Sequence, residues 1–397
     1  MKTSRSGFRF SAIAGAAFLM ANSSIGPGFL TQTTVFTAQL LTSFGFVILL
    51  SVLLDIGAQL NTWRILTVTG MRAQDLANAL APGLGYLLCI LVVLGGFAFN
   101  IGNVAGCGLG LNVLFGLSFR EGAILSAVLA LALFWIREIG GMLDRLTPVL
   151  GVLKIGLTLL VAYIVHPPLG AALYHTVFPE KVSATAVVTI VGGTVGGYIT
   201  FSGAHRLLDA GITGLPNQHR VNRSAVSGIV ISTVMRFVLF LAVVGAVLHG
   251  VVPDKDNPAA SVFAFGAGPL GLRVFGVVLW SAALSSVVGA SYTAVSFFKT
   301  FHPVLARYER LWISLFIVLS AIIFVVVGRP KQLLLLAGWV NGLILPFALA
   351  VLLVAATRPR LMQGYRHPLW MQAMGWLVVV AVGGMSLVSL LRPGLLK

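Results

Sequence analysis

Gly26-Pro27-Gly28 lies inside the first long apolar segment of this chain, which runs over residues 10–40. Proline has no backbone N–H to donate within a helix, and glycine adopts backbone conformations that other residues avoid. A helix over this segment is therefore predicted to be interrupted at the tripeptide. The apolar run continues beyond it without a convincing cleavage site, so we expect a retained membrane span and not a signal peptide.

The composition predicts that this interrupted helix lies in a membrane. Of 397 residues, 58% are hydrophobic and 9% are charged, whereas soluble domains carry about 25% charged residues. Apolar stretches of the roughly 20 residues needed to cross the hydrocarbon recur along the whole chain. We therefore expect an all-α integral membrane protein in which residues 1–397 form one transmembrane domain. Eleven spans are predicted, at residues 10–40, 43–66, 84–115, 122–136, 147–165, 186–208, 226–249, 273–300, 311–328, 333–356 and 370–391.

The 26 Lys and Arg residues give a formal net charge of +16, which could indicate a nucleic-acid-binding protein. They are scattered singly between apolar spans, so nucleic acid is excluded as a partner and the lipid bilayer is expected instead. With a cytoplasmic N-terminus, the inner segments hold seventeen of them, Lys154 included, the outer segments hold eight, and Arg236 falls within a span. This asymmetry follows the positive-inside rule and predicts a bacterial cytoplasmic (inner) membrane protein whose C-terminus lies outside.

A second interruption is predicted in the sixth span, which contains Gly192-Gly193 and Gly196-Gly197, followed by Ser202-Gly203-Ala204-His205. Broken helices at equivalent places in two halves of a chain are typical of transporters built from inverted repeats. Irregular backbone at membrane depth is tolerated only where it lines a cavity or is buried in protein. The alternative is that these glycines only pack helices together. We expect a first repeat over 10–165, a second over 186–356 and an extra C-terminal helix over 370–391.

Further stretches make the chain resemble the NRAMP family of divalent-metal transporters over most of its length. Each stretch is a weak signal alone, but together they occur in the family's order and at suitable spacing. They are Thr69-Gly70 with Asp75-Leu76-Ala77 after the second span, Phe99 to Gly116 in the third, Ala282 to Tyr292 in the eighth and Leu345 to Leu349 in the tenth. The resemblance implies a leucine-transporter-like fold of five plus five inverted helices, with broken helices 1 and 6 around a central site.

The metal-binding residues of the family are missing from the matching positions. The family's first-helix Asp-Pro-Gly-Asn matches Gly26-Pro27-Gly28-Phe29, and its sixth-helix Met-Pro-His matches Gly203-Ala204-His205. The third-helix acids, which the family ties to proton movement, match Asn100 and Asn103. Hard divalent cations favour several oxygen ligands, and softer ones favour sulfur or imidazole. The sequence therefore predicts no confident metal site, since only His205 persists among these ligands.

The groups that the breaks retain suit an anion better than a bare cation. A helix that begins at a break exposes backbone N–H groups at the positive end of its dipole, and relatives of this fold place a substrate carboxylate there. A mostly apolar site with a few fixing polar groups suits a small organic molecule. The predicted substrate-binding residues are Gly26, Pro27, Gly28, Phe29, Gln32, Thr33, Phe201, Ser202, Gly203, Ala204 and His205.

Two charged side chains are predicted at membrane depth, Asp55 in the second span and Arg236 in the seventh. Such residues are costly in lipid and are functional by default. They could form a structural pair, Asp55 could carry a proton, or Arg236 could bind a substrate carboxylate. His205 could bind substrate, relay a proton or cap a half-helix.

The coupling ion is left open between H⁺ and Na⁺. Ser285 and Ser286 match a region where related folds hold sodium, but serines that bond back to their own helix are an equal alternative. Near the inner end of the sixth span, Asp209 is expected to pair with Arg206. The candidates for ion coupling are Asp55, Asn100, Asn103, Arg236, Ser285 and Ser286.

The leading functional hypothesis is an ion-coupled secondary active transporter, a symporter, for a small carboxylate derived from an amino acid. Pyroglutamate is one example, which the resemblance prompts and no residue selects. The alternative is a divalent metal transporter of the NRAMP family, for Mn²⁺ or for Mg²⁺ held with its water shell. We expect no cofactor. We also expect that the protein is not an enzyme, because no Ser/His, Cys/His, paired-acid or His-Glu-x-x-His pattern lies at membrane depth. A channel would lack paired breaks. The oligomeric state is left open.

Overall fold

The computed structural model of this protein describes residues 24–391, with the backbone alone for residues 137–149. Within this range all regular secondary structure is helical, as the composition predicts. The α-helices are α2 (Pro27–Leu40), α3 (Phe44–Thr69), α4 (Ala73–Leu80), α5 (Leu84–Phe115), α6 (Phe119–Trp135), α7 (Arg137–Ile164), α8 (Leu169–Val177), α9 (Ala184–Thr194), α10 (Ile199–Asp209), α11 (Gln218–Leu248), α12 (Pro258–Phe298), α13 (Pro303–Arg307), α14 (Glu309–Val327), α15 (Pro330–Ala356) and α16 (Leu369–Leu391). Two short 3₁₀ helices complete them, η1 (Leu41–Ser43) and η2 (Leu215–Asn217).

Every predicted span coincides with one or two of these helices, although residues 10–23 of the first lie outside the described range. By length and apolar composition, eight described segments could each cross a membrane, or nine if α7 and α8 are counted as one bent span. The prediction of eleven is larger for two reasons. It separates α2 from α3, which the smaller count joins as Pro27–Thr69, and it includes α6, which has 17 residues.

The helices that the sequence analysis did not predict are short or follow a bend. α4 and α13 are short helices in the connections between long ones, and α8 has 9 residues and is bent by 110° from α7. α12 begins earlier than predicted because its first helical part lies before a kink at Gly268 and Pro269. At this kink Gly268 has a φ of 62°. None of these pieces is long enough to cross the hydrocarbon alone, so a search for apolar spans passes over them.

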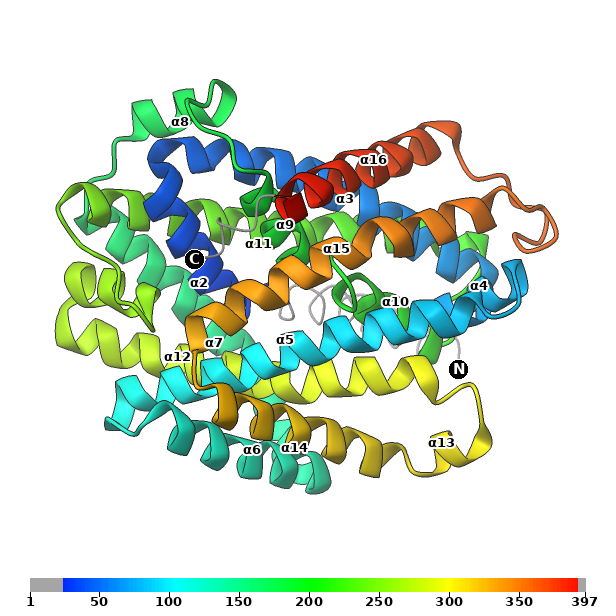
Figure 1. Cartoon of the computed structure of the whole chain (residues 1–397), viewed down its shortest axis with the longest axis horizontal. Helices are drawn as coiled ribbons and strands as arrows, with labels where there is room; N and C mark the ends of the chain where they lie inside the picture. The colour runs from blue at the N-terminus through cyan, green and yellow to red at the C-terminus, as the bar shows by residue number, and fades with distance from the viewer. Residues whose placement is uncertain (1–23, 392–397) are drawn as a thin grey trace, which may run out of the picture.

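The centre of the molecule depends on contacts between helix backbones. Figure 1 shows α15 crossing in front of α9, with α5 running beside it. A Cβ atom on Gly192 of α9 would lie 2.0 Å from the carbonyl oxygen of Gly338 and 2.3 Å from the backbone nitrogen of Gly342, both on α15. Because any side chain at Gly192 would collide with backbone, these glycines allow α9 to lie directly against α15.

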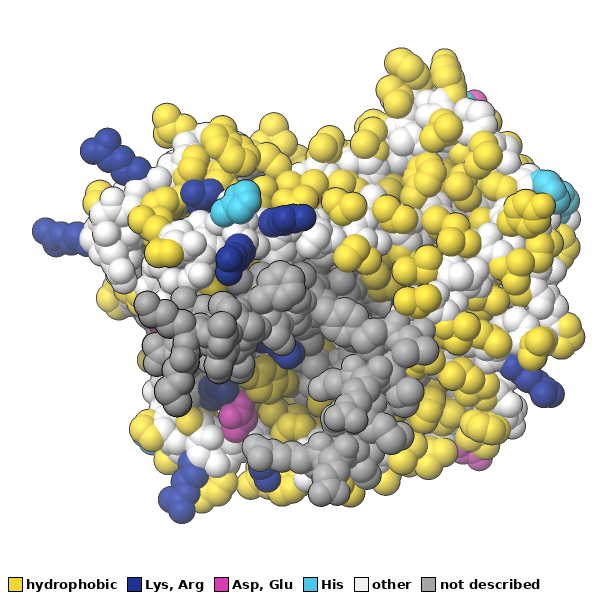
Figure 2. Space-filling view, turned by 180° about the vertical axis from the view of Figure 1, so that it is seen from behind, with side chains coloured by type: hydrophobic (Ala, Val, Ile, Leu, Met, Phe, Trp, Pro, Cys, Tyr) yellow, Lys and Arg dark blue, Asp and Glu magenta, His cyan; other side chains and the backbone are white. Residues whose placement is uncertain are grey.

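The surface has the character expected of a protein surrounded by lipid. Large apolar side chains on α5, α6, α12, α14 and α16 are exposed, and Figure 2 shows hydrophobic side chains spread over much of one face. In the same view most of the visible Lys and Arg side chains gather toward the end that carries α4 and α13 in Figure 1. The protein is therefore an integral membrane protein with basic residues concentrated toward one end.

A buried histidine connects the loop before α16 to α3. His367 Nε2 lies 2.7 Å from Asn61 Oδ1, and Asn61 Nδ2 donates to the carbonyl oxygens of Gly57 and Met371. Asn61 Oδ1 is therefore the acceptor and His367 Nε2 carries the proton, while His367 Nδ1 is buried without a hydrogen-bond partner among the described residues. Burial, with the charge of Arg64 nearby, lowers the pKa of His367 to about 4.

Mild acid is expected to destabilise the fold through His367. In the unfolded chain the pKa of histidine returns to about 6.5, so the unfolded state binds one more proton between pH 6.5 and 4. Stability is then lost as the pH falls through this window, by about 2 kcal/mol at pH 5. Thermal unfolding followed by tryptophan fluorescence should show a smaller drop in Tm from pH 7 to pH 5 in His367→Gln, whose amide can still donate to Asn61. Equal drops in the two proteins would contradict this assignment.

Candidate functional site

The first predicted interruption is present where the tripeptide lies. Ser24 is helical, Ile25 and Gly26 form a bend, and α2 begins at Pro27. Proline is well suited to the first helical position, because its missing N–H has no partner there in any case. The Pro27 ring packs against Gly106 of α5, where a Cβ atom would lie only 2.2 Å from Pro27 Cγ. This contact places the break against the middle of the bundle.

The second predicted interruption is also present, between α9 and α10. α9 ends at Thr194, residues 195–198 form a turn, and α10 begins at Ile199. Gly197 in this turn has φ of +49°, and a Cβ atom there would lie 1.7 Å from Asn341 Oδ1 of α15. Because both the backbone conformation and the available space exclude a side chain, glycine is required here.

Gln32 brings the two breaks together. Its Nε2 donates to the carbonyl oxygen of Leu334 at 2.9 Å. Cβ atoms on Gly193 and Gly338 would each lie 2.4 Å from an end atom of the Gln32 amide, Oε1 and Nε2 respectively. The side chain is thus held between α9 and α15, yet Oε1 is buried without a hydrogen-bond partner among the described residues. A buried acceptor of this kind is costly unless something donates to it.

Arg236 of α11 lies between residues of both interrupted helices. Its Nη1 donates to Thr194 Oγ1, at the end of α9, at 2.8 Å. Its guanidinium carbon lies 4.5 Å from the centre of the Phe29 ring, in the first turn of α2. The side chain is buried, and in the described part of the chain Nε and Nη2 have no hydrogen-bond partner. Two N–H directions of a planar guanidinium are therefore available at this point.

Asp55 belongs to the same group but forms no ion pair with Arg236 in the described part of the chain. It is buried on α3, where the charge of Arg236 and the side chain of Thr194 both act on it. No oxygen of Asp55 lies within 4.0 Å of an Arg236 nitrogen among the described ion pairs, and Asp55 Oδ1 has no hydrogen-bond partner among the described residues. Thr194 thus lies at the centre of this group, a role that the sequence analysis did not assign.

Lys154 is a correction to the sequence analysis, which counted it with the basic residues of the inner segments. The structure buries it within α7, and its Nζ donates to the carbonyl oxygen of Ile25, in the bend of the first break, at 2.8 Å. The position of this lysine inside the predicted span 147–165 was the sequence signal that could have indicated its burial. A second cation, besides Arg236, is therefore buried at the first break.

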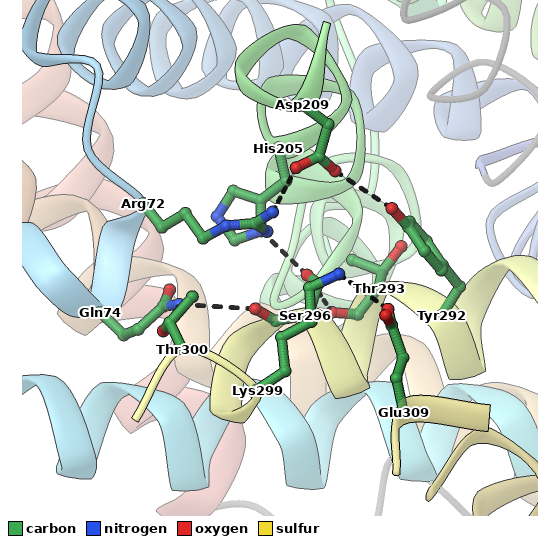
Figure 3. Close-up of polar contacts among 10 residues, drawn as sticks. All are labelled: Arg72, Gln74, His205, Asp209, Tyr292, Thr293, Ser296, Lys299, Thr300 and Glu309. Atoms are coloured by element: carbon green, nitrogen blue, oxygen red, sulfur yellow. Dashed lines mark hydrogen bonds and ion pairs between the residues drawn. The ribbon is translucent and has the colours of Figure 1, made fainter. Parts of the chain in front are cut away.

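His205 lies on α10 and faces α12 (Figure 3). Its Nδ1 lies 3.0 Å from Ser296 Oγ, which itself donates to the carbonyl oxygen of Thr293, so Nδ1 is the donor. Its ring packs against Phe201 and Phe297, and in the described part of the chain Nε2 is buried without a partner. Phe201 and His205 therefore form a separate group on α10, whose described contacts are with α12.

Polar contacts around Asp209 join α10 to the loop before α4 and to α12 (Figure 3). Asp209 pairs with Arg72, in the loop before α4, and accepts a hydrogen bond from the Tyr292 hydroxyl at 3.0 Å. The expected pair with Arg206 is therefore wrong, because Arg206 on the same helix is exposed and Arg72 reaches Asp209 from another segment. Lys299 and Glu309 form a further ion pair at 2.7 Å. We call Arg72, Asp209, Tyr292, Lys299 and Glu309 the end cluster.

The remaining coupling candidates lie on the helices around the breaks. Asn100 donates to Ser291 of α12 at 3.1 Å and to Ser320 of α14 at 3.0 Å. Asn103 interacts with Tyr198 in the turn of the second break. Ser285 bonds back to the carbonyl oxygen of Ala282 on its own helix, as the alternative interpretation proposed.

Four neutral residues complete the predicted substrate site. Thr33 Oγ1 is buried without a partner among the described residues, and Ser202 bonds back to the carbonyl oxygen of Ile199. Gly203 and Ala204 lie within α10. Ser286 Oγ, a coupling candidate, is likewise buried without a described partner. Over the described residues, no three His, Cys, Asp or Glu side chains lie close enough together to hold a metal ion.

Comparison with known sequences connects this arrangement to one family. The family model described as "Natural resistance-associated macrophage protein-like" (Nramp) matches residues 17–392. An uncharacterized membrane protein of Bacillus subtilis, YcsG, is 54% identical over 96% of this chain and 94% of its own. The divalent metal cation transporter MntH of Brucella suis is 25% identical over 90% of this chain and 85% of its own.

Solved structures show the same fold. A manganese transporter of Eremococcus coleocola superimposes with a TM-score of 0.74 at 18% sequence identity, covering 95% of this chain and 86% of its own. MhsT, solved in complex with L-phenylalanine, superimposes with a TM-score of 0.61 at 17% identity, covering 97% and 98%. The predicted leucine-transporter-like fold, with broken helices 1 and 6, is thereby confirmed.

Proposed function

This chain belongs to the Nramp family, and on that premise we propose that it is an ion-coupled secondary active transporter whose substrate is a small organic carboxylate. The observation that carries this proposal is the buried guanidinium of Arg236, which contacts both interrupted helices and keeps Nε and Nη2 without a described partner. A guanidinium with free N–H groups is the side chain best matched to a carboxylate, which it can bind through two parallel hydrogen bonds.

The charges at the breaks favour an anion. Lys154 and Arg236 are the cations there, and Asp55 is the one acid described beside them. Two unit charges 4 Å apart interact by about 4 kcal/mol at the effective dielectric constant typical near a protein surface. A divalent cation would meet twice that repulsion from each fixed positive charge, whereas a carboxylate would neutralise the excess positive charge.

The neutral groups favour a carboxylate that also carries an N–H. Gln32 Oε1 touches the position of Gly193, and Arg236 binds the adjacent Thr194, so both side chains lie at the same end of α9. Gln32 Oε1 needs a donor and Arg236 offers donors. Phe29 adds an apolar wall. A compact molecule with an acid group and an amide or amine N–H satisfies these groups, and pyroglutamate is the first candidate.

A second candidate is a divalent metal ion, because the matched relatives of named function carry one. MntH of Brucella suis is named a divalent metal cation transporter, and the superimposed Eremococcus protein is named a manganese transporter. Among the described side chains, His205 Nε2 is an imidazole nitrogen without a hydrogen-bond partner that such an ion could use. Mg²⁺ or Mn²⁺ would then have to keep much of its water shell.

Uptake into liposomes that contain the purified protein separates the two candidates. We expect saturable uptake of labelled L-pyroglutamate that a large excess of Mn²⁺ or Mg²⁺ does not compete away, and no uptake of the metals themselves. Liposomes without protein give the background, and a panel of other small carboxylates shows how strongly the N–H matters. Metal uptake that His205→Ala abolishes, together with no uptake of any carboxylate, would overturn the proposal.

A further inference from the structure

Lys154 occupies an unusual place for a lysine in a membrane protein. It lies within α7, is 8% exposed, and its Nζ donates to the carbonyl oxygen of Ile25 at 2.8 Å. Burying an ammonium group is costly unless it gains strong partners. Its own backbone carbonyl accepts from Thr158 one turn later, so α7 is regular at this point. The side chain therefore reaches from an intact helix to an interrupted one.

The partner of Lys154 is a backbone carbonyl that the break exposes. Ile25 lies in the bend before α2, and helix ends leave carbonyl groups without intrahelical partners. Within a membrane such groups must be satisfied by protein or by an ion. Unwound carbonyls at helix breaks are where transporters of broken-helix design bind their coupling cations. Here a cation that is part of the protein already satisfies the carbonyl.

The surroundings of Lys154 leave its charge without a close counter-ion. In the described part of the chain no carboxylate oxygen lies within 4.0 Å of its Nζ. α2 has no charged or histidine residue, and the helices that pack against α7 are α6, α11 and α12. On these three helices, Arg236 is the buried charged residue. Their other titratable residues are exposed or half-buried, and so is Lys299 directly after α12; those on the helices are Arg120, Glu121, His219, Arg220, Arg223, Arg273 and Tyr292.

We propose that Lys154 is the proton-coupling group of this transporter. As an ammonium ion it holds the first break against α7, and when it gives its proton to water the carbonyl of Ile25 loses its charged donor. The one covalent bond that changes is an N–H bond of Lys154. It breaks as water takes the proton to form hydronium, and it re-forms when the amine takes a proton from hydronium on the other side of the membrane. This inference rests on the proposed transport function, and it makes the coupling ion H⁺, with no requirement for Na⁺ at this break.

A first experiment tests Lys154 without any substrate. Hydrogen–deuterium exchange, read by mass spectrometry in peptides over residues 24–33, reports how firmly the break is held. After correction for the intrinsic pH effect, exchange in the wild-type protein should rise about tenfold from pH 6 to pH 9, as a charge-assisted hydrogen bond is lost. Lys154→Gln should exchange fast at both pH values and Lys154→Arg slowly at both. The proposal is overturned if the corrected exchange rate of the wild-type protein does not change with pH. It is also overturned if this rate equals that of Lys154→Gln at pH 6.

A second experiment asks whether Lys154 couples transport. In liposomes, Lys154→Gln removes one positive charge at the breaks, so it should exchange labelled for unlabelled L-pyroglutamate with a raised KM, reaching the wild-type rate at saturating concentration. It should not accumulate L-pyroglutamate when the outside is made acidic. Lys255→Gln, at an exposed lysine, is the matched control and should accumulate it like wild type. A lysine that only holds the fold would remove exchange and accumulation together. Accumulation that survives in Lys154→Gln, or that depends on Na⁺ in wild type, overturns the proposal. If the wild-type protein does not exchange L-pyroglutamate, the substrate assignment is wrong. The role of Lys154 is then tested by the hydrogen–deuterium exchange of residues 24–33 alone.

Discussion

Arg236→Gln is expected to reduce carboxylate uptake by at least about 30-fold, since removing one partner from a buried charged pair costs about 2–5 kcal/mol. In the wild-type protein Arg236 contacts Phe29 and Thr194 and keeps two N–H groups for the substrate. Glutamine retains one amide donor group, but it has neither the positive charge nor the two parallel N–H donors of the guanidinium. Initial rates over a range of L-pyroglutamate concentrations measure the loss, which should be similar for Arg236→Lys if paired hydrogen bonds matter more than charge alone.

Two companion variants make this result interpretable. Arg223→Gln changes an exposed arginine of the same helix and should transport like wild type. Removing Arg236 leaves Asp55 buried without its cation, so the double variant Asp55→Asn/Arg236→Gln should regain thermal stability without regaining uptake. Uptake by a well-folded Arg236→Gln at the wild-type rate would contradict the assignment of this residue to the substrate.

Gly192→Ala is expected to have the largest effect on the fold. The added methyl group would lie 2.0 Å from the carbonyl oxygen of Gly338, and both atoms that it meets first are backbone atoms that no change of rotamer can move. Overpacking a core costs about 1–3 kcal/mol and sometimes more, so α9 and α15 should separate and the protein should express poorly or melt early. Thermal unfolding and size-exclusion chromatography measure this effect.

Gly289→Ala is the matched control for that variant. Gly289 also lies within a long membrane helix, α12, but a Cβ atom there would meet no atom of the described residues within 4 Å. Because alanine has a higher helix propensity than glycine, this variant should be as stable as wild type or slightly more so. If the two variants are equally stable, the close contact of α9 with α15 does not hold the fold as described.

The sequence was sufficient to predict most of the helices and both breaks, for a physical reason. A membrane span must be a long apolar helix, and Gly26-Pro27-Gly28 and the glycines between Gly192 and Gly197 cannot continue one without cost. The short helices α4, α8 and α13 were missed because none is long enough to give a spanning signal. Residues 69–77 were matched to the family only as a motif, and α4 itself was not predicted.

The site was predicted less completely, because its contacts join residues far apart in the chain. Phe29, Gln32 and Arg236 were named beforehand and do lie at the breaks. Thr194 was not named, since a threonine at the end of an apolar helix carries no pattern. The partners Arg72 and Asp209 are separated by 137 positions, a distance over which no periodicity extends. By contrast, Lys154 could have been found as a charge within a predicted span.

The end cluster has a consequence for the thermodynamics of this protein. The side chains of Arg72 and Asp209 keep 12% and 36% of their exposure, and those of Lys299 and Glu309 keep 17% and 30%. Ion pairs that remain in contact with water contribute only about 0–1 kcal/mol each. These two pairs therefore favour the described arrangement of α10 beside α4 and α12 only slightly over one in which the pairs are separated. A substrate that bound the separated arrangement more tightly by the same small amount would offset the contribution of these pairs.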